Sequence, residues 1–166
     1  MFKIILFKFI IYLIVSSSAA FIPNANSVIF RELKVFNEIL NTKNLLCHYQ
    51  SARVKTFESA YNKMKRIQIS NIYNVYDLIG FRYVFYTKED LLKFYHHLKF
   101  EKDIIMIKNY LNSPKKNGYK AFHFKYKNIY MDCPINFLEC QLYIIDDYYN
   151  SLYGTAQYEK NYTHFF

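Results

Sequence analysis

The sequence predicts an α+β domain in which a mixed, mostly antiparallel sheet is flanked by helices. Two observations predict this class. Two segments with apolar residues at helical spacing come first. Most of the runs rich in β-branched and aromatic residues lie in the second half of the chain. The expected order is helix, helix, strand, helix, strand, strand, strand, helix. Because strands and helices do not alternate throughout, this order favours a mixed sheet over an all-parallel one.

The helices are predicted from the spacing of their apolar residues. Such residues recur every three or four positions from Val28 to about Leu46, and again from Glu58 to Ile67. The same spacing predicts a shorter helix at Lys88–Lys99 and a last helix at Asp146–Tyr158. No proline interrupts any of these four segments.

Four strands are predicted from β-branched and aromatic content. The first is Tyr76–Tyr86, in which Gly80 is expected to cause a break or a bulge. The others are Asp103–Lys108, Lys120–Tyr130 and Phe137–Ile145. In the strand that begins at Lys120, aromatic residues alternate with polar ones, which predicts one buried face and one polar face.

The N-terminus is predicted to be a signal peptide at residues 1–20. An apolar run from Phe9 to Val15 is followed by small residues at Ser18–Ala20. The run is shorter than the roughly 20 residues that cross a bilayer. We therefore expect one domain at residues 21–166, a secreted or secretory-routed protein, and no stable membrane span after removal of the signal. An uncleaved anchor and a buried N-terminal element are the alternatives.

Charge and cysteine content narrow the choice of partners. The formal net charge is +9, which favours polyanions such as a nucleotide, a nucleic acid or an anionic membrane. Cys47, Cys133 and Cys140 fit no metal-ligand spacing, and an odd number leaves at least one free thiol on a secretory route. Cys140 lies in an apolar run and is predicted to be a core residue.

The segment Pro114–His123 combines lysines, an amide, an aromatic ring and an imidazole. Lysines and His123 can bind phosphate oxygens, Asn117 can bind a ribose or a base edge, and Tyr119 can stack on a purine. Asn117 and Gly118 also mark a tight turn. This segment is therefore either part of a nucleotide site or a solvated hairpin turn.

Two carboxylates point to phosphate chemistry. Asp77 precedes a predicted strand, and Glu139 lies inside an apolar one, where an unpaired carboxylate is costly to bury. A solvent-facing edge strand is the alternative for Glu139. Two carboxylates can hold Mg²⁺ against a triphosphate, and one can take a proton from a hydroxyl. Cations to balance the phosphates are available at Arg53, Lys55 and Lys63, although each also fits a solvated basic face.

These segments together resemble the synthetase domain of the RelA/SpoT family, the enzymes that make ppGpp and pppGpp. The resemblance runs from Arg53 to Glu139 and more weakly to Tyr162. Each piece is short, but four pieces in the right order at compatible spacings make the match specific. The pieces are Arg53-Val54-Lys55 with Ser59–Met64, Asp77–Arg82, Lys108–His123 and Glu139–Leu142.

The resemblance implies a fold related to the nucleotidyltransferases and the transfer of pyrophosphate from ATP to the 3′-hydroxyl of GDP or GTP. It implies Asp77 and Glu139 as catalytic residues that hold Mg²⁺. Stand-alone relatives often assemble, so a homo-oligomer is also implied. The implied ATP-binding residues are Arg53, Lys55, Ser59, Lys63 and Arg82, and the implied GDP/GTP-binding residues are Lys108, Lys115, Asn117, Tyr119, His123 and Gln141.

Four positions depart from the family pattern. Asn109, Ala121, Tyr143 and Leu152 stand where the family often has aspartate, serine, arginine and glutamate, respectively. These departures leave two other functions open. One is a toxin of the same family that pyrophosphorylates the 3′ end of tRNA, and the other is an inactive relic that binds nucleotide or RNA.

Overall fold

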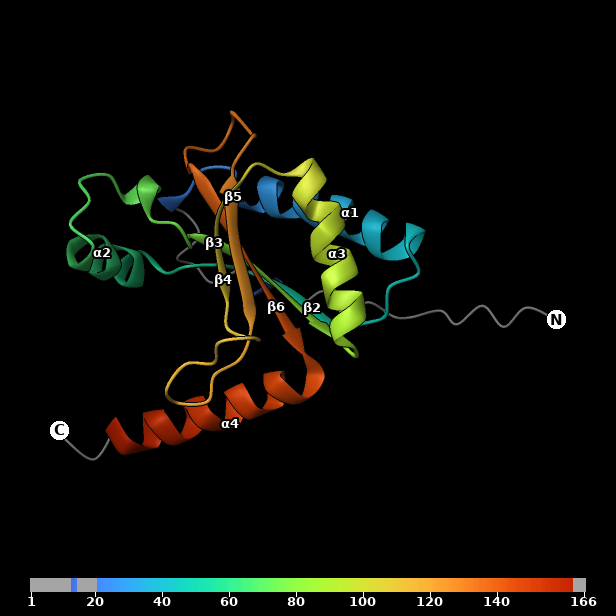
Figure 1. The fold of residues 1–166 in the computed structure, drawn as a ribbon. Coiled ribbons are helices and arrows are strands. Elements are labelled where there is room, and N and C mark those ends of the chain that lie inside the picture. Colours follow the sequence, from blue (N-terminus) through green and yellow to red (C-terminus); the bar gives the residue numbers. More distant parts are fainter. Residues whose placement is uncertain (1–12, 15–20, 163–166) are drawn as a thin grey trace.

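The computed structural model of the protein describes Leu13–Ile14 and residues 21–162, and it contains one six-stranded sheet with helices on both sides (Figure 1). Apart from Leu13 and Ile14, the predicted signal peptide at residues 1–20 lies outside the described residues. Within the described ranges, no helix is long and apolar enough to cross a membrane.

The sheet is mixed and mostly antiparallel, as predicted. Its strand order is β1-β2-β3-β6-β5-β4. Two neighbouring pairs are parallel, β1 with β2 and β3 with β6, and the other three are antiparallel. The strands are β1 (Leu13–Ile14), β2 (Cys47–Val54), β3 (Ile79–Phe85), β4 (Ile104–Asn109), β5 (Phe122–Lys127) and β6 (Phe137–Ile144).

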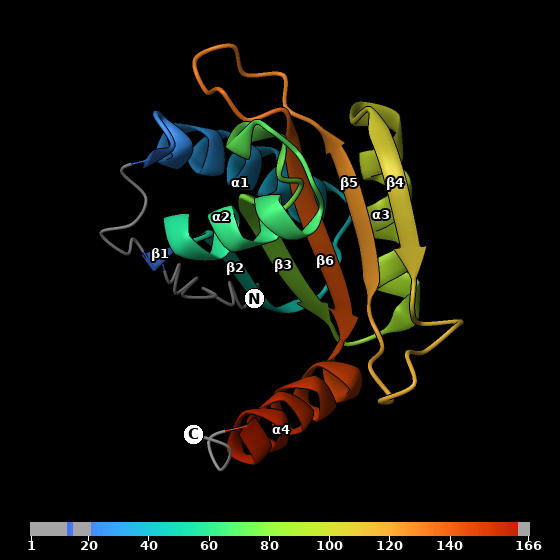
Figure 2. The same ribbon diagram turned by 90° about the vertical axis from the view of Figure 1, so that its left-hand side faces the viewer.

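The helices agree with the predicted segments apart from their ends. They are α1 (Ala25–Thr42), α2 (Phe57–Arg66), α3 (Lys88–Glu101) and α4 (Ile145–Tyr162), and a short 3₁₀ turn, η2, covers Ile72–Asn74. Helices α1 and α3 lie on one side of the sheet and α2 lies on the other, while α4 runs across one end (Figure 1). In the view of Figure 2, β2, β3, β6, β5 and β4 follow one another across the molecule behind α2.

Strand β2 was not predicted, and the predicted first helix was too long at its C-terminus. Helix α1 ends at Thr42 because Asn44 adopts the left-handed conformation, with φ of 50°. The Leu45 N–H then donates to the Leu40 carbonyl at 2.9 Å and the Asn44 N–H to the Asn41 carbonyl at 3.2 Å. These two bonds form a Schellman motif, which stops the helix and directs the chain into β2.

Gly80 does not break its strand. The ladder is continuous through this residue, which pairs with Arg53 of β2 and with Glu139 of β6. The prediction of a break or bulge at Gly80 is therefore wrong. The only register shift between β2 and β3 in the described residues lies between Cys47 and Tyr49.

The core fills the space between the sheet and the pair α1 and α3. The Phe36 ring of α1 lies edge-on to Phe81, Tyr83 and Phe94, with ring centroids 5.3–5.9 Å apart. Cys140 is fully buried in this core, as predicted. The alternation predicted for β5 is also confirmed, since its three aromatic residues join the core and His123 and Lys125 lie on the opposite face.

One carboxylate is buried in this core. Glu32 of α1 is completely buried and accepts hydrogen bonds from Lys102 at 2.7 Å, Tyr126 at 2.7 Å and Tyr130 at 2.8 Å. The Lys102 ammonium is itself almost fully buried. The charges of Glu32 and Lys102 balance each other, so both can be buried. Through its three hydrogen bonds, Glu32 joins α1 to the end of α3, to β5 and to the loop after β5.

We predict that Glu32→Ala lowers the free energy of unfolding by about 3–5 kcal/mol, because it leaves the buried Lys102 ammonium without its partner. Urea denaturation followed by circular dichroism measures the change. The matched control is Glu89→Ala, which removes an exposed ion pair to Lys93 on α3. This control should leave stability essentially unchanged. Equal effects of the two substitutions would contradict the structural role of Glu32.

Candidate functional site

The candidate site lies on the face of the sheet that α1 and α3 leave uncovered. Strand pairing places its residues in two rows that run across the strands. One row contains Arg53, Gly80, Glu139, Lys125 and Met106. Since neighbouring residues in paired strands share a face, the members of a row point to the same side of the sheet.

The second row lies two residues further along each strand. It contains Ser51, Arg82, Gln141, His123 and Lys108. Four of these five were predicted site residues, and the structure brings them together from four different strands. Arg53 and Arg82 lie in different rows, but both line a hollow of about 130 Å³ next to Gly80. Arg53 passes over that glycine, with its Nε 3.7 Å from the position of a Cβ there.

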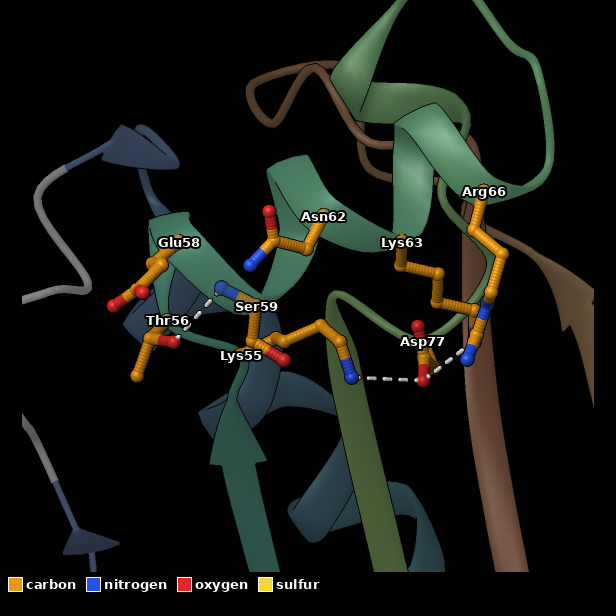
Figure 3. A pocket seen from close by; sticks show the side chains of 8 residues that line it. All are labelled: Lys55, Thr56, Glu58, Ser59, Asn62, Lys63, Arg66 and Asp77. Carbon is orange, nitrogen blue, oxygen red and sulfur yellow. Dashed lines mark hydrogen bonds and ion pairs between the residues drawn. The ribbon is translucent and has the colours of Figure 1, made fainter. Parts of the chain in front are cut away.

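A larger hollow of about 510 Å³ lies beside α2 (Figure 3). It contains three of the predicted ATP-binding residues, Lys55, Ser59 and Lys63, together with Asp77. The other predicted ATP-binding residues, Arg53 and Arg82, line the smaller hollow instead. The remaining lining residues of the large hollow are Thr56, Glu58, Asn62 and Arg66.

Helix α2 is mostly exposed, and its polar side lines this hollow. Ala60 is its only buried residue. The helix starts directly after β2, where the Thr56 side chain accepts a hydrogen bond from the Ser59 N–H at 3.3 Å. This N-cap fixes the first turn. Lys63 and Arg66 then follow on the side of the helix that lines the hollow.

Asp77 is the anionic centre of the large hollow. Lys55 and Lys63 reach it from two sides, and their Nζ atoms lie 3.0 Å and 2.8 Å from Oδ2 (Figure 3). Burial by itself raises the pKa of Asp77, but the hydrogen bonds and positive charges of the two lysines outweigh it and hold the pKa below its ordinary value. The other oxygen, Oδ1, is buried and has no hydrogen-bond partner.

Glu139 is the second carboxylate. It lies on β6, an inner strand between β3 and β5, and is 8% exposed. The alternative of a solvent-facing edge position is therefore wrong. Its Oε2 accepts a hydrogen bond from Gln141 Nε2 at 2.9 Å, and its Oε1 lies 4.0 Å from His123 Nδ1.

A chain of hydrogen bonds connects Glu139 to the loop before β5. Gln141 Oε1 accepts from the Tyr143 hydroxyl at 3.2 Å. That hydroxyl lies 2.7 Å from the Tyr119 hydroxyl, which in turn lies 2.7 Å from His123 Nε2. The predicted acceptor residues Tyr119, His123 and Gln141 therefore form one network with Glu139, which is a predicted catalytic residue.

The loop itself is a tight turn, and its backbone agrees with the turn prediction. Gly118 has φ of 79°, and its N–H donates to the Lys115 carbonyl at 2.8 Å. The Asn117 side chain accepts a hydrogen bond from the Tyr119 N–H at 3.2 Å, so it stabilises the turn. Lys115 Nζ lies 4.6 Å from the centroid of the Tyr119 ring and 4.7 Å from that of Tyr110. The roles predicted for Asn117 and Lys115 in nucleotide binding stay predictions.

Sequence reasoning missed two side chains that the structure places in this region, Lys125 and Tyr143. Period-two spacing could have found both. Lys125 is two residues after His123 on β5, and Tyr143 is two residues after Gln141 on β6. Arg66 and Asn62, which line the large hollow, were also missed as site residues.

Residues 52–161 match the family model described as "Region found in RelA / SpoT proteins". The match covers well over half of the chain and includes the end of β2 and all of β3, β4, β5 and β6. The protein therefore belongs to the RelA/SpoT family.

Individual relatives agree with this assignment. GTP pyrophosphokinase YwaC of Bacillus subtilis (strain 168) is 30% identical over an alignment of 105 residues that covers 59% of this chain and 47% of the relative. The matched region thus spans about half the length of that protein. The crystal structure of small alarmone synthetase 2 from Bacillus subtilis superposes with a TM-score of 0.68 at 26% identity, covering 81% of this chain and 77% of that one.

A more distant structure has the same fold. Small alarmone synthetase 1 from Bacillus subtilis, solved bound to its product pppGpp, gives a TM-score of 0.63 at 19% identity, covering 77% of this chain and 72% of that one. These structural likenesses confirm the predicted fold class.

We predict that stability falls as the pH is lowered from about 6.5 toward 4, because His123 is held neutral in the folded protein. Burial, and then the charges of Lys115 and Lys108, lower the pKa of His123 from 6.5 to about 4. The unfolded chain takes up a proton below pH 6.5 and the folded chain does not until about pH 4. The contribution of neutral His123 to the free energy of unfolding is therefore complete above pH 6.5. About 3 kcal/mol of it is lost as the pH falls from 6.5 to about 4.

Urea denaturation at several pH values between 7.5 and 4.5 measures this loss. His123→Asn cannot titrate there, so it should remove most of the pH dependence in this window. Asp77 has a lowered pKa, so it changes the pH dependence of stability only below about pH 3.8, which is outside this window. A variant with the same pH dependence as the unaltered protein would show that His123 is not the group responsible.

Proposed function

We propose that the protein transfers the pyrophosphoryl group of ATP to the 3′-hydroxyl of GDP or GTP and so makes ppGpp or pppGpp. The observation that carries this proposal is the hydrogen-bond chain from Tyr119 through Tyr143 and Gln141 to Glu139. It joins an aromatic platform for a base to a carboxylate that can accept a proton. Family membership, the printed activity of YwaC and the pppGpp bound to small alarmone synthetase 1 support the same reaction.

The large hollow beside α2 is proposed as the donor site. Lys55, Lys63 and Arg66 provide three cations around a space large enough for a polyphosphate. Lysine and arginine bind phosphate oxygens through charge-assisted hydrogen bonds. Arg53 and Arg82 extend the positive charge from this hollow across the sheet.

The opposite part of the open face is proposed as the acceptor site. Tyr119 offers its ring to the guanine base. Lys108 and Lys115 lie near enough to His123 to lower its pKa. Their ammonium groups can bind the acceptor phosphates. His123 is neutral at pH 7, so it can hydrogen-bond a ribose hydroxyl without adding charge.

Glu139 is proposed as the general base. In the reaction the acceptor 3′-oxygen forms a bond to the β-phosphorus of ATP, the bond from that phosphorus to the α,β-bridging oxygen breaks, and AMP leaves. Glu139 takes the proton of the 3′-hydroxyl. Gln141 holds one oxygen of this carboxylate at 2.9 Å and so orients the other toward the acceptor.

The residues present fit a magnesium ion. Asp77 Oδ1 is buried without a partner, and Glu139 lies on the strand that pairs with the start of β3. Mg²⁺ prefers carboxylate and phosphate oxygens and usually keeps only one or two protein ligands. No cluster of three or more metal-ligating side chains occurs among the described residues, which agrees with a metal held jointly with substrate. Asp77 and Glu139 would hold the ion, which supplies charge neutralisation for the phosphates.

The acceptor is tested with purified protein, Mg²⁺ and ATP labelled in its γ-phosphate, offered with GDP, GTP or tRNA. Label on the guanine nucleotide is expected. Label on tRNA would instead identify the RNA-modifying function that the net charge of +9 also suits. Absence of transfer to all three acceptors would identify a binding protein without this activity.

We predict that Glu139→Gln lowers kcat for transfer by at least about 100-fold, because the amide cannot accept the proton. The substitution keeps the volume of the side chain and a carbonyl oxygen for Gln141. Thermal unfolding should therefore be unchanged, and binding of ATP should change little. A variant with more than a tenth of the normal kcat would remove Glu139 from the role of base.

We predict that Tyr119→Ala raises KM for the guanine nucleotide about 10-fold or more and leaves KM for ATP nearly unchanged. Stacking of a base on an aromatic ring is worth about 1–3 kcal/mol. Tyr119→Phe separates the ring from the hydroxyl. It should keep the acceptor KM while breaking the contacts to Tyr143 and His123. If Tyr119→Phe weakens acceptor binding as much as Tyr119→Ala, the hydroxyl network and not the ring binds the acceptor.

A further inference from the structure

Lys125 of β5 occupies the centre of the open face. Strand pairing places it directly opposite Glu139 on one side and Met106 on the other. The residue is 8% exposed, although its neighbour on the same face, Lys127, is exposed. A lysine this deeply enclosed needs an explanation, because burying an ammonium group without an anionic partner is unfavourable.

The Lys125 ammonium is not ion-paired in the part of the chain that the structure describes. Among the described residues it takes part in no hydrogen bond or ion pair, whereas Lys127 lies 2.6 Å from Asp103 and Lys102 lies 2.7 Å from Glu32. Its nearest ring is Tyr76, whose centroid lies 4.4 Å from Nζ. Tyr76 rests in turn on Phe137, with centroids 5.1 Å apart. The aromatic pair thus fixes the position of the ammonium but leaves its charge unmatched.

Both carboxylates act electrostatically on Lys125. Burial lowers the pKa of Lys125, and the charges of Lys63 and Lys108 lower it further. Glu139 and Asp77 act in the opposite direction. Lys125 is therefore within electrostatic range of Asp77 and Lys63 in the donor hollow and of Glu139 and Lys108 on the acceptor side.

We infer that Lys125 is a further catalytic residue, whose ammonium binds the oxygens of the pyrophosphoryl group during its transfer from donor to acceptor. This inference rests on the proposed function. The transfer joins the donor hollow to a hydroxyl near Glu139, and strand pairing places Lys125 directly beside Glu139. The Lys125 cation would meet the charge that the oxygens of the group carry, and its aromatic support would keep it in place.

The test compares Lys125→Met with Lys127→Met. The first removes a charge inside the site, and the second removes a charge two residues along the same strand, outside the site. Loss of a charge-assisted hydrogen bond to phosphate is expected to lower kcat by about 10–100-fold in Lys125→Met. Lys127→Met should keep kcat within about twofold. Lys125→Arg, which keeps the charge, should restore part of the lost rate.

A second measurement uses binding alone. The ATP analogue with a methylene group between its α- and β-phosphates cannot transfer its pyrophosphoryl group, so calorimetric titration in Mg²⁺ reports affinity without turnover. Lys125→Met should bind it about 10-fold more weakly than the unaltered protein and Lys127→Met. Normal kcat together with normal affinity in a folded Lys125→Met variant would overturn the inference.

These measurements separate this inference from the proposed function. Failure of the unaltered protein to transfer label would overturn the reaction, and the titration would still decide whether Lys125 binds polyphosphate. If Lys125→Met does not fold, NMR of ¹³C-methylated lysines in the otherwise unaltered chain replaces the variant. The Lys125 signal should then move on addition of the Mg²⁺-bound analogue while that of Lys127 does not, and an unmoved Lys125 signal would overturn the inference.

Discussion

The pairing of β6 between β3 and β5 is the constraint on which the open face depends. Its parallel register with β3 sets Glu139 beside Gly80, and its antiparallel register with β5 sets the same residue beside Lys125. A shift of one residue in either pair would turn every side chain of that strand to the other face. Cys140 and Leu142 would then face the open side, and Glu139 would enter the core between the sheet and α1. The buried apolar face therefore fixes the geometry of the polar one.

The two faces meet different physical requirements with the same strands. On the covered face, aromatic rings from α1, α3 and the sheet exclude water, and the buried carboxylate of Glu32 is fully satisfied by three donors. On the open face, polar atoms remain unsatisfied at Asp77 and Arg82. Buried groups without partners are rare in folded proteins. Such atoms also occur at Asn37, Gln50 and Tyr83, so they do not by themselves mark the open face. The enclosed Lys125, which has no hydrogen bond or ion pair among the described residues, is the feature typical of a surface that is completed by a charged ligand.

Much of this arrangement could be predicted from the sequence, and what was missed has physical causes. The family motifs identified Asp77, Glu139 and the Tyr119 loop, and period-two alternation identified the polar face of β5. Strand β2 was missed because its pattern is not apolar: Ser51 and Arg53 face the open side, and Gln50 faces the core. Its stability comes from pairing with β3, which is a non-local contact that no local pattern encodes. Lys125 was missed because a lysine in an alternating strand usually points to solvent, and only the neighbouring strands enclose it.

The two lysines on Asp77 suggest how the hollow beside α2 accommodates charge. Both bind the same oxygen, Oδ2, and leave Oδ1 without a partner. With two cations and one anion, the cluster carries an excess of positive charge in a partly buried place, and Arg66 adds to it. A polyphosphate offers several anionic oxygens, so Lys55 and Lys63 can contact phosphate without leaving Asp77 unsatisfied if a divalent cation takes their place at the carboxylate. In the proposed reaction, the ion pairs would keep the lysines in position for a phosphate ligand.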